Sequence, residues 1–184
     1  MAVPHIPCLR LGEPYVSLNK IEVTDYRDGA TKATVSQVNA GVVRRDLQRI
    51  DEARAALRSF STTELIEIGA KAGEIFLNGE VEIGVEGEMQ SPTQYVETLS
   101  STSGLPHVMV RRNMDKIHYA LTNMQVVLNG LTRGIDPSIL DAGVGEQFGT
   151  KVCFYPTSSA LGIVMPSNSP AVNSLWLPAI ALKT

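Results

Sequence analysis

The sequence predicts a mixed α/β fold in which a β-hairpin and a layer of helices precede a strand–turn–helix unit. The hairpin is predicted by residues 20–26 and 32–38, which alternate apolar and polar side chains on either side of Asp28-Gly29, a strong turn signal. The helices are predicted by apolar residues that recur at helical spacing between residues 41 and 128. The last unit is predicted by the apolar run 161–165, which leads through a Pro-x-Asn turn into a second apolar run.

The middle of the chain is expected to be helical, with local signals that mark where helices start and stop. The expected ranges are about 41–57, 63–78, 91–103 and 107–128. Thr62 or Thr63 suits the N-cap of the second helix, and Asn78-Gly79 is expected to end it in a left-handed C-cap. Ser91-Pro92 opens the third helix, because proline suits the first helical position.

The remaining segments are expected to be less regular. Residues 1–18 contain several prolines and are expected to form an irregular arm, and 80–88 a loop or a short strand. Residues 132–148 are expected to form a loop with one short helix started by Asp136-Pro137. Two strands, 151–157 and 161–165, and a helix over 170–182 that Pro178 kinks complete the prediction.

Composition excludes several classes of protein. The 184 residues are 43% hydrophobic and 19% charged, which is typical of a globular chain. The net charge of −3 and the absence of any Lys/Arg cluster predict no nucleic-acid binding. No apolar run approaches the length of a membrane span, and the N-terminus does not resemble a signal peptide, so we expect a cytoplasmic protein. The two cysteines and three histidines lack metal-ligand spacing, so no metal is expected.

The turn after residue 165 is the strongest candidate for a functional site. Pro166 fixes its own φ and pushes Met165 towards extended geometry, so the turn is stiff. A stiff turn holds the Asn168 amide in a defined position, as the donor of an oxyanion hole requires. Asparagine is also a good helix N-cap, and spacing alone does not separate the two roles.

The segment Gly162-Ile-Val-Met-Pro-Ser-Asn-Ser-Pro170 resembles the first βα unit of the aldehyde dehydrogenase superfamily, whose usual form is Ile-x-Pro-Trp-Asn-x-Pro. The resemblance implies that Asn168 helps to form the oxyanion hole. It also implies that Val164, Met165, Pro166, Ser167 and Asn168 contact a bound NAD or NADP. Ser167 stands where the family has tryptophan. This chain therefore lacks the bulky side chain that forms a wall at this position in the family.

The same resemblance implies a domain organisation, because a hairpin and helices also precede the first βα unit in this family. Residues 1–18 would be an arm and 19–148 the hairpin and helical layer of the cofactor-binding domain. Residues 149–162 would be an oligomerisation-type strand pair, and 163–184 the first, truncated βα unit of a Rossmann-like fold. The nucleophilic cysteine and the base glutamate of the family would then lie beyond residue 184.

The expected function is therefore that of the N-terminal segment of an NAD(P)-dependent oxidoreductase. It would oxidise an aldehyde through a cysteine thiohemiacetal, act as a homo-oligomer, and be inactive as this segment alone. The turn is also similar to that of CoA-acylating aldehyde dehydrogenases and acyl-CoA reductases, which often have small polar residues there. The substrate would then be an acyl-CoA. A non-enzymatic interaction or binding module is the third alternative. Cys153 precedes the turn and is interpreted as a core or interface residue, and Cys8 lies in the arm without a base near it in sequence.

Overall fold

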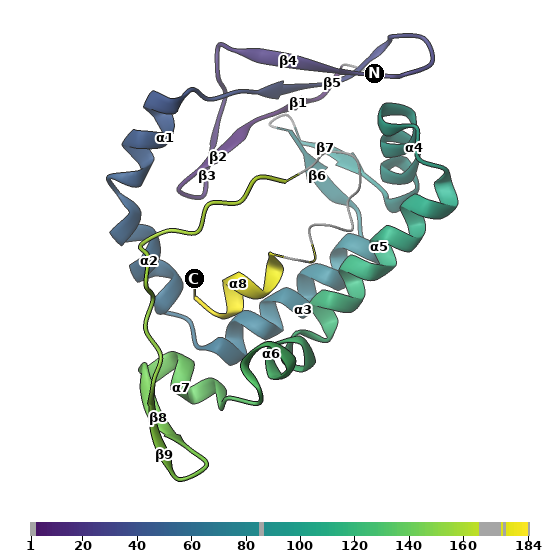
Figure 1. Cartoon of the computed structure of the whole chain (residues 1–184). Helices are drawn as coiled ribbons and strands as arrows, with labels where there is room; N and C mark the ends of the chain where they lie inside the picture. Colours follow the sequence, from purple (N-terminus) through teal and green to yellow (C-terminus); the bar gives the residue numbers. More distant parts are fainter. Residues whose placement is uncertain (1–2, 85–86, 166–173, 175, 184) are drawn as a thin grey trace. The chain divides into compact units, whose positions relative to one another are not determined.

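The structure, a computed structural model, describes residues 3–84, 87–165, 174 and 176–183 (Figure 1). This described part has a mixed α/β architecture with eight helices and nine short strands. It divides into two compact units, which are described in turn. One unit comprises Met1–Arg49 with Ile75–Met114, and the other Ile50–Glu74 with Asp115–Thr184.

The helices and strands alternate along the chain in short elements. The helices are α1 (Ala40–Leu47), α2 (Ile50–Arg58), α3 (Thr62–Asn78), α4 (Pro92–Ser103), α5 (His107–Thr122), α6 (Met124–Thr132), α7 (Pro137–Ala142) and α8 (Leu177–Ala181). The strands are β1 (His5–Ile6), β2 (Cys8–Arg10), β3 (Glu13–Tyr15), β4 (Lys20–Thr24), β5 (Thr31–Ser36), β6 (Val81–Ile83), β7 (Glu88–Gln90), β8 (Val144–Gln147) and β9 (Thr150–Cys153). Among the described helices, none is both long and apolar enough to cross a bilayer.

The predicted first hairpin is confirmed. Strand β4 pairs antiparallel with β5, and Gly29 takes a φ of 73° in the turn between them. The arm before it is more regular than expected, because β1 adds to β5 in parallel. Strands β2 and β3 form a second hairpin, in which Leu11 and Gly12 both have positive φ. A two-residue turn with positive φ at both positions matches the twist of paired strands. The hairpin therefore forms although this part of the chain contains several prolines.

The core of the first unit lies between α4, the end of α3 and the first half of α5. Val96, Val110 and Met114 are buried together, and the rings of Phe76 and Tyr95 meet edge to face at 5.5 Å beside them. Helix α4 begins as predicted. Ser91 and Gln94 form a capping box there, with proline in the first turn, and Gly104 closes the helix at a φ of 76°.

The core of the second unit is built around α6 and α8. Met124, Leu128 and Ala181 are buried, and Ile66, Val127, Leu177 and Leu182 pack against them. The predicted helix 107–128 is interrupted at Asn123, whose amide nitrogen donates to the carbonyl oxygen of Tyr119 at 3.0 Å. A side chain that bonds its own helix in this way competes with the backbone ladder, so α5 ends and α6 starts afresh.

Other predicted helix boundaries were wrong in detail. The expected helix 41–57 is divided into α1 and α2, neither of which has a buried residue. Helix α3 is capped by Ser61, whose hydroxyl accepts from the Glu64 amide while the Glu64 carboxylate accepts from the Ser61 amide. Thr62 is not the cap, because its hydroxyl donates to Asp141. Gly79 does not adopt a positive φ, and its amide donates to the carbonyl of Ile75.

The strands near the C-terminus also differ from the prediction. The pair that forms is β8 with β9, joined by Phe148 and Gly149 at φ values of 52° and 74°. A phenylalanine is an unusual residue for such a turn, so residues 148 and 149 carry no strong hairpin signal. Residues 161–165 form no strand, because no described strand lies alongside to complete a ladder. Pro178 lies in the first turn of α8, where it does not kink the helix.

Candidate functional site

The predicted cofactor turn is described only at its start. Val164 is 99% exposed and Met165 is half-buried. Pro166, Ser167 and Asn168 lie outside the described residues. The structure therefore places two of the five predicted site residues, and brings neither of them together with another candidate group.

The segment that leads to this turn is apolar and uncovered. Leu161 and Ile163 are exposed, as is Val164. Among the described residues none pairs with 161–165 in a sheet. An apolar run that is exposed and lies outside any described sheet is suited to pairing with further chain.

The far side of the turn is held firmly in the second unit. After α8, the Lys183 ammonium lies 2.7 Å from the Asp141 carboxylate, and the lysine side chain is only 8% exposed. The same carboxylate oxygen accepts from the amide and the hydroxyl of Thr62, at 2.8 and 2.7 Å. Burial raises the pKa of Asp141, but hydrogen bonds from Lys183 and Thr62 outweigh it and hold the pKa below its usual value.

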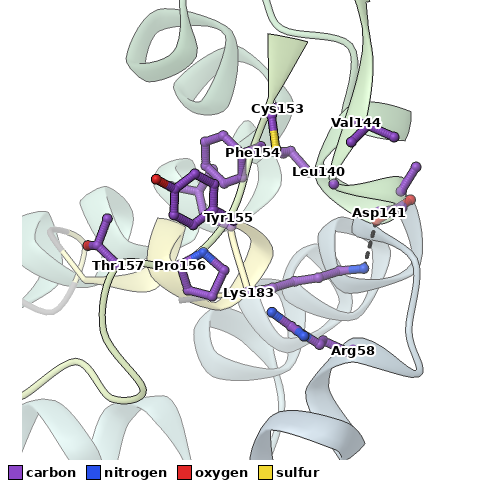
Figure 2. A pocket seen from close by; sticks show the side chains of 13 residues that line it. Arg58, Leu140, Asp141, Val144, Cys153, Phe154, Tyr155, Pro156, Thr157 and Lys183 are labelled. Carbon is purple, nitrogen blue, oxygen red and sulfur yellow. Dashed lines mark hydrogen bonds and ion pairs between the residues drawn. The ribbon is translucent and has the colours of Figure 1, made fainter.

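A recess of about 470 Å³ opens beside this ion pair (Figure 2). We call it the α7 recess. Its lining comes from Arg58 at the end of α2, from residues 140–144, from residues 153–157 after β9, and from Leu182 and Lys183. Figure 2 shows the rings of Phe154 and Tyr155 on one side and the cationic chains of Arg58 and Lys183 on another. The sequence gives no signal for this grouping, because its members come from four distant segments.

The cysteines do not form a nucleophilic site within the described residues. Cys8 is half-buried, and its thiol donates to the carbonyl oxygen of Ser36 at 3.1 Å. Cys153 is exposed at the mouth of the α7 recess, so it is not the core residue that one interpretation of the sequence predicted. No group of three metal-ligating side chains occurs in the described ranges.

The histidines take structural positions. His107 is exposed at the start of α5, and His118 is half-buried with its Nε2 atom 2.7 Å from a carboxylate oxygen of Glu74. His5 links β1 to β5, since its ring nitrogens lie 2.8 and 2.9 Å from the hydroxyls of Thr34 and Ser36. Both hydroxyls are thus committed to holding the sheet together.

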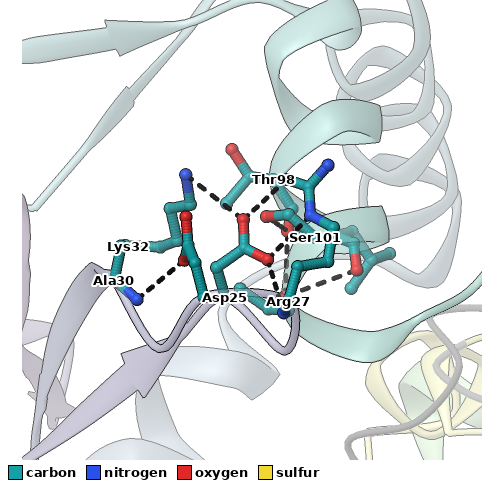
Figure 3. Close-up of polar contacts among 9 residues, drawn as sticks. Asp25, Arg27, Ala30, Lys32, Thr98 and Ser101 are labelled. Atoms are coloured by element: carbon teal, nitrogen blue, oxygen red, sulfur yellow. Dashed lines mark hydrogen bonds and ion pairs between the residues drawn. The ribbon is translucent and has the colours of Figure 1, made fainter.

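A second polar cluster stabilises the first unit around Asp25, which is 1% exposed (Figure 3). Its carboxylate accepts from the Arg27 backbone amide and guanidinium, and the Lys32 ammonium lies 3.4 Å away. The hydrogen bonds from Arg27 hold the pKa of Asp25 well below its usual range. The next residue, Tyr26, donates its amide to the carbonyl of Ser101, so the cluster fastens the β4–β5 turn to α4. We interpret this cluster as structural.

Comparison of the chain with protein-family models, curated proteins and solved structures finds no match.

Proposed function

We propose that this chain is the N-terminal segment of an NAD(P)-dependent oxidoreductase similar to the aldehyde dehydrogenases. The proposal rests on one juxtaposition: the exposed, unpaired apolar run 161–165 leads directly into Pro166-Ser-Asn168. A run of this kind fits the first strand of a larger sheet whose neighbouring strands are supplied by further sequence. In the proposed enzyme that further sequence also supplies the nucleophilic cysteine and the base glutamate.

Each candidate residue has a distinct task in this proposal. The Asn168 side-chain amide donates to the oxygen that becomes negative when a thiolate attacks the aldehyde carbon, and it does so without titrating. Val164 to Asn168 contact the nicotinamide cofactor, which accepts the hydride when it is bound. The Lys183–Asp141 pair and the packing of α8 in the second unit keep the helix after the turn in place.

The first test is the intact mass of the protein in its source cells, together with an assay for aldehyde oxidation with NAD⁺ and NADP⁺. We expect a mass well above the 19.9 kDa of this chain and a cofactor-dependent activity. Replacing Asn168 by Ala should lower kcat by about 10²–10³-fold and have a smaller effect on cofactor binding, to which Val164 to Ser167 also contribute. Asn173→Ala is the matched control and should retain activity. A native mass of 19.9 kDa without activity would instead favour the non-enzymatic module.

A CoA-acylating enzyme is the second candidate, because Ser167 and Ser169 give the turn the small polar residues found in that branch. The same assay separates the two outcomes by product. Release of a free acid that is independent of CoA indicates the hydrolytic enzyme, whereas a thioester formed only with CoA indicates the acylating one.

We further propose that the protein works as a homo-oligomer. The β8–β9 hairpin has open edges among the described strands, and Phe148 in its turn is 92% exposed. Light scattering should therefore report a mass of at least two chains. A monodisperse monomer over a range of concentrations would argue against this assembly.

A further inference from the structure

We propose that the α7 recess is a binding site for a small amphiphilic anion, distinct from the described residues of the predicted cofactor site. Arg58 contacts the anionic group, a carboxylate, sulfonate or phosphate, and the rings of Phe154 and Tyr155 contact the apolar part. None of residues 161–165 lines the recess, so the site goes beyond the proposed dehydrogenase function. Its volume of about 470 Å³ is that of a small-molecule pocket.

Two cationic side chains line the recess, and only Lys183 has an anionic partner among the described residues. Lys183 is neutralised by Asp141 at 2.7 Å, and the remaining hydrogen bonds to that carboxylate come from neutral Thr62 donors. No carboxylate of the described residues pairs with Arg58. An arginine with its donors still available at the edge of a recess is well suited to a planar or tetrahedral oxyanion, which it can bind through two parallel hydrogen bonds.

The apolar side of the recess is preformed but uncovered. The amide of Phe154 donates to the carbonyl of Gly143 at 2.7 Å, which fixes the chain just after β9 against the end of α7. Tyr155 follows with 70% of its surface exposed. Leu140 and Pro156 continue the same lining. An aromatic or aliphatic group of the ligand would cover this surface. The free energy gained by burying apolar area would add to the electrostatic attraction between Arg58 and the anionic group of the ligand.

Two fluorescent probes that share one ring system test both parts of the site. 1-Anilinonaphthalene-8-sulfonate carries a sulfonate, and N-phenyl-1-naphthylamine is the same skeleton without it. We expect the 184-residue chain to bind the sulfonate with 1:1 stoichiometry and roughly fivefold or more tighter than the neutral probe, because a charge-assisted contact in a partly exposed site adds about that factor.

Three variants then assign the contacts. Arg58→Gln should weaken the sulfonate about fivefold and leave the neutral probe unchanged, whereas Arg58→Lys should keep most of the charge effect. Tyr155→Ser should weaken both probes. Arg54→Gln is the matched control, because Arg54 lies one turn earlier on α2 and pairs with Asp51; it should change neither affinity.

The four variants change three side chains, all at exposed or half-exposed positions, so the fold should persist, and circular dichroism of each variant checks this. The proposal is overturned if the sulfonate does not bind saturably, if it binds no tighter than the neutral probe, or if Arg58→Gln binds it as the wild type does. It is also overturned if self-association of the chain abolishes binding, since the recess would then be an interface.

Discussion

Two hairpins, β4–β5 in the first unit and β8–β9 in the second, each have a glycine with positive φ in the turn but differ in their surroundings. Gly29 and Gly149 occupy the turns with φ values of 73° and 74°. In the first hairpin Ala33 and Ser36 are buried, and the Asp25 side chain is buried beside the more exposed cation Arg27. In the second, Phe148 is 92% exposed. The difference shows that a local turn is enough to pair two strands, whereas burial depends on what the rest of the unit supplies.

We therefore expect the first hairpin to contribute to the stability of its unit, and the second hairpin to provide a binding surface. Charge-assisted hydrogen bonds from Arg27 to Asp25 order the β4–β5 turn, and the backbone hydrogen bond from Tyr26 to Ser101 joins this turn to α4. The second hairpin is joined to α7 mainly through β8, where Gly145 lies directly against Ile139. Five substitutions, each set with its own control or comparison, test this division, from the largest expected effect to the smallest.

Asp25→Ala should be the most damaging change in this set. It removes an enclosed carboxylate and leaves the donors of Arg27 and Lys32 without their acceptor. We expect the melting temperature to fall by roughly 8 °C. Asp28→Ala is the control, because Asp28 is in the same turn but makes only an exposed bond to the Ala30 amide. Equal losses for the two variants would show that the enclosed cluster has no special role.

The Asp25 cluster also predicts a dependence of stability on pH. Because the folded-state pKa of Asp25 lies below its unfolded value of about 3.9, its contribution is complete above pH 4 and is lost as the pH falls through the folded pKa. Asp25→Asn should flatten the decline in melting temperature between pH 5 and about pH 2. Part of the decline should remain, because hydrogen bonds also lower the pKa values of other carboxyl groups: Asp46, Glu64, Asp136 and Asp141.

Gly145→Ala tests the contact of the second hairpin with α7. A Cβ atom at this position would lie 2.5 Å from Cγ1 of Ile139, which is buried, so one of the two elements must shift. We expect a loss of about 2 kcal/mol, or roughly 5 °C in melting temperature. Gly130→Ala is the control, because a Cβ there meets nothing within 4 Å and alanine favours the α6 helix. A Gly145 variant as stable as wild type would mean that β8 is not packed on α7.

Gly29→Ala and Gly149→Ala should have the smallest and most similar effects. A Cβ meets nothing within 4 Å at either position, so the only penalty is a positive φ. We expect about 1 kcal/mol for each. Hydrogen exchange should locate the loss in β4 and β5 for the first variant and in β8 and β9 for the second. A much larger loss at Gly149 would contradict the idea that this hairpin is the less integrated one.

The sequence by itself determined the elements whose signals are local. The Asp28-Gly29 turn, the helix start at Ser91-Pro92 and the short helix opened by Asp136-Pro137 all formed as predicted, because caps and turns depend on a few neighbouring residues. The Pro166-Ser-Asn168 pattern is equally local, and its proposed role comes from family resemblance. That role and the oligomeric state remain predictions.

Tertiary structure decided the features that join distant segments. Residues 161–165 have the apolar pattern of a strand but no described neighbour, and a strand exists only when another completes its hydrogen bonds. The apolar face of α1 and α2 likewise stays unburied within the described residues. The α7 recess unites Arg58, Tyr155 and Lys183, which no spacing in the sequence connects. Periodicity specifies which face a segment offers, but only packing against another element determines whether that face is buried.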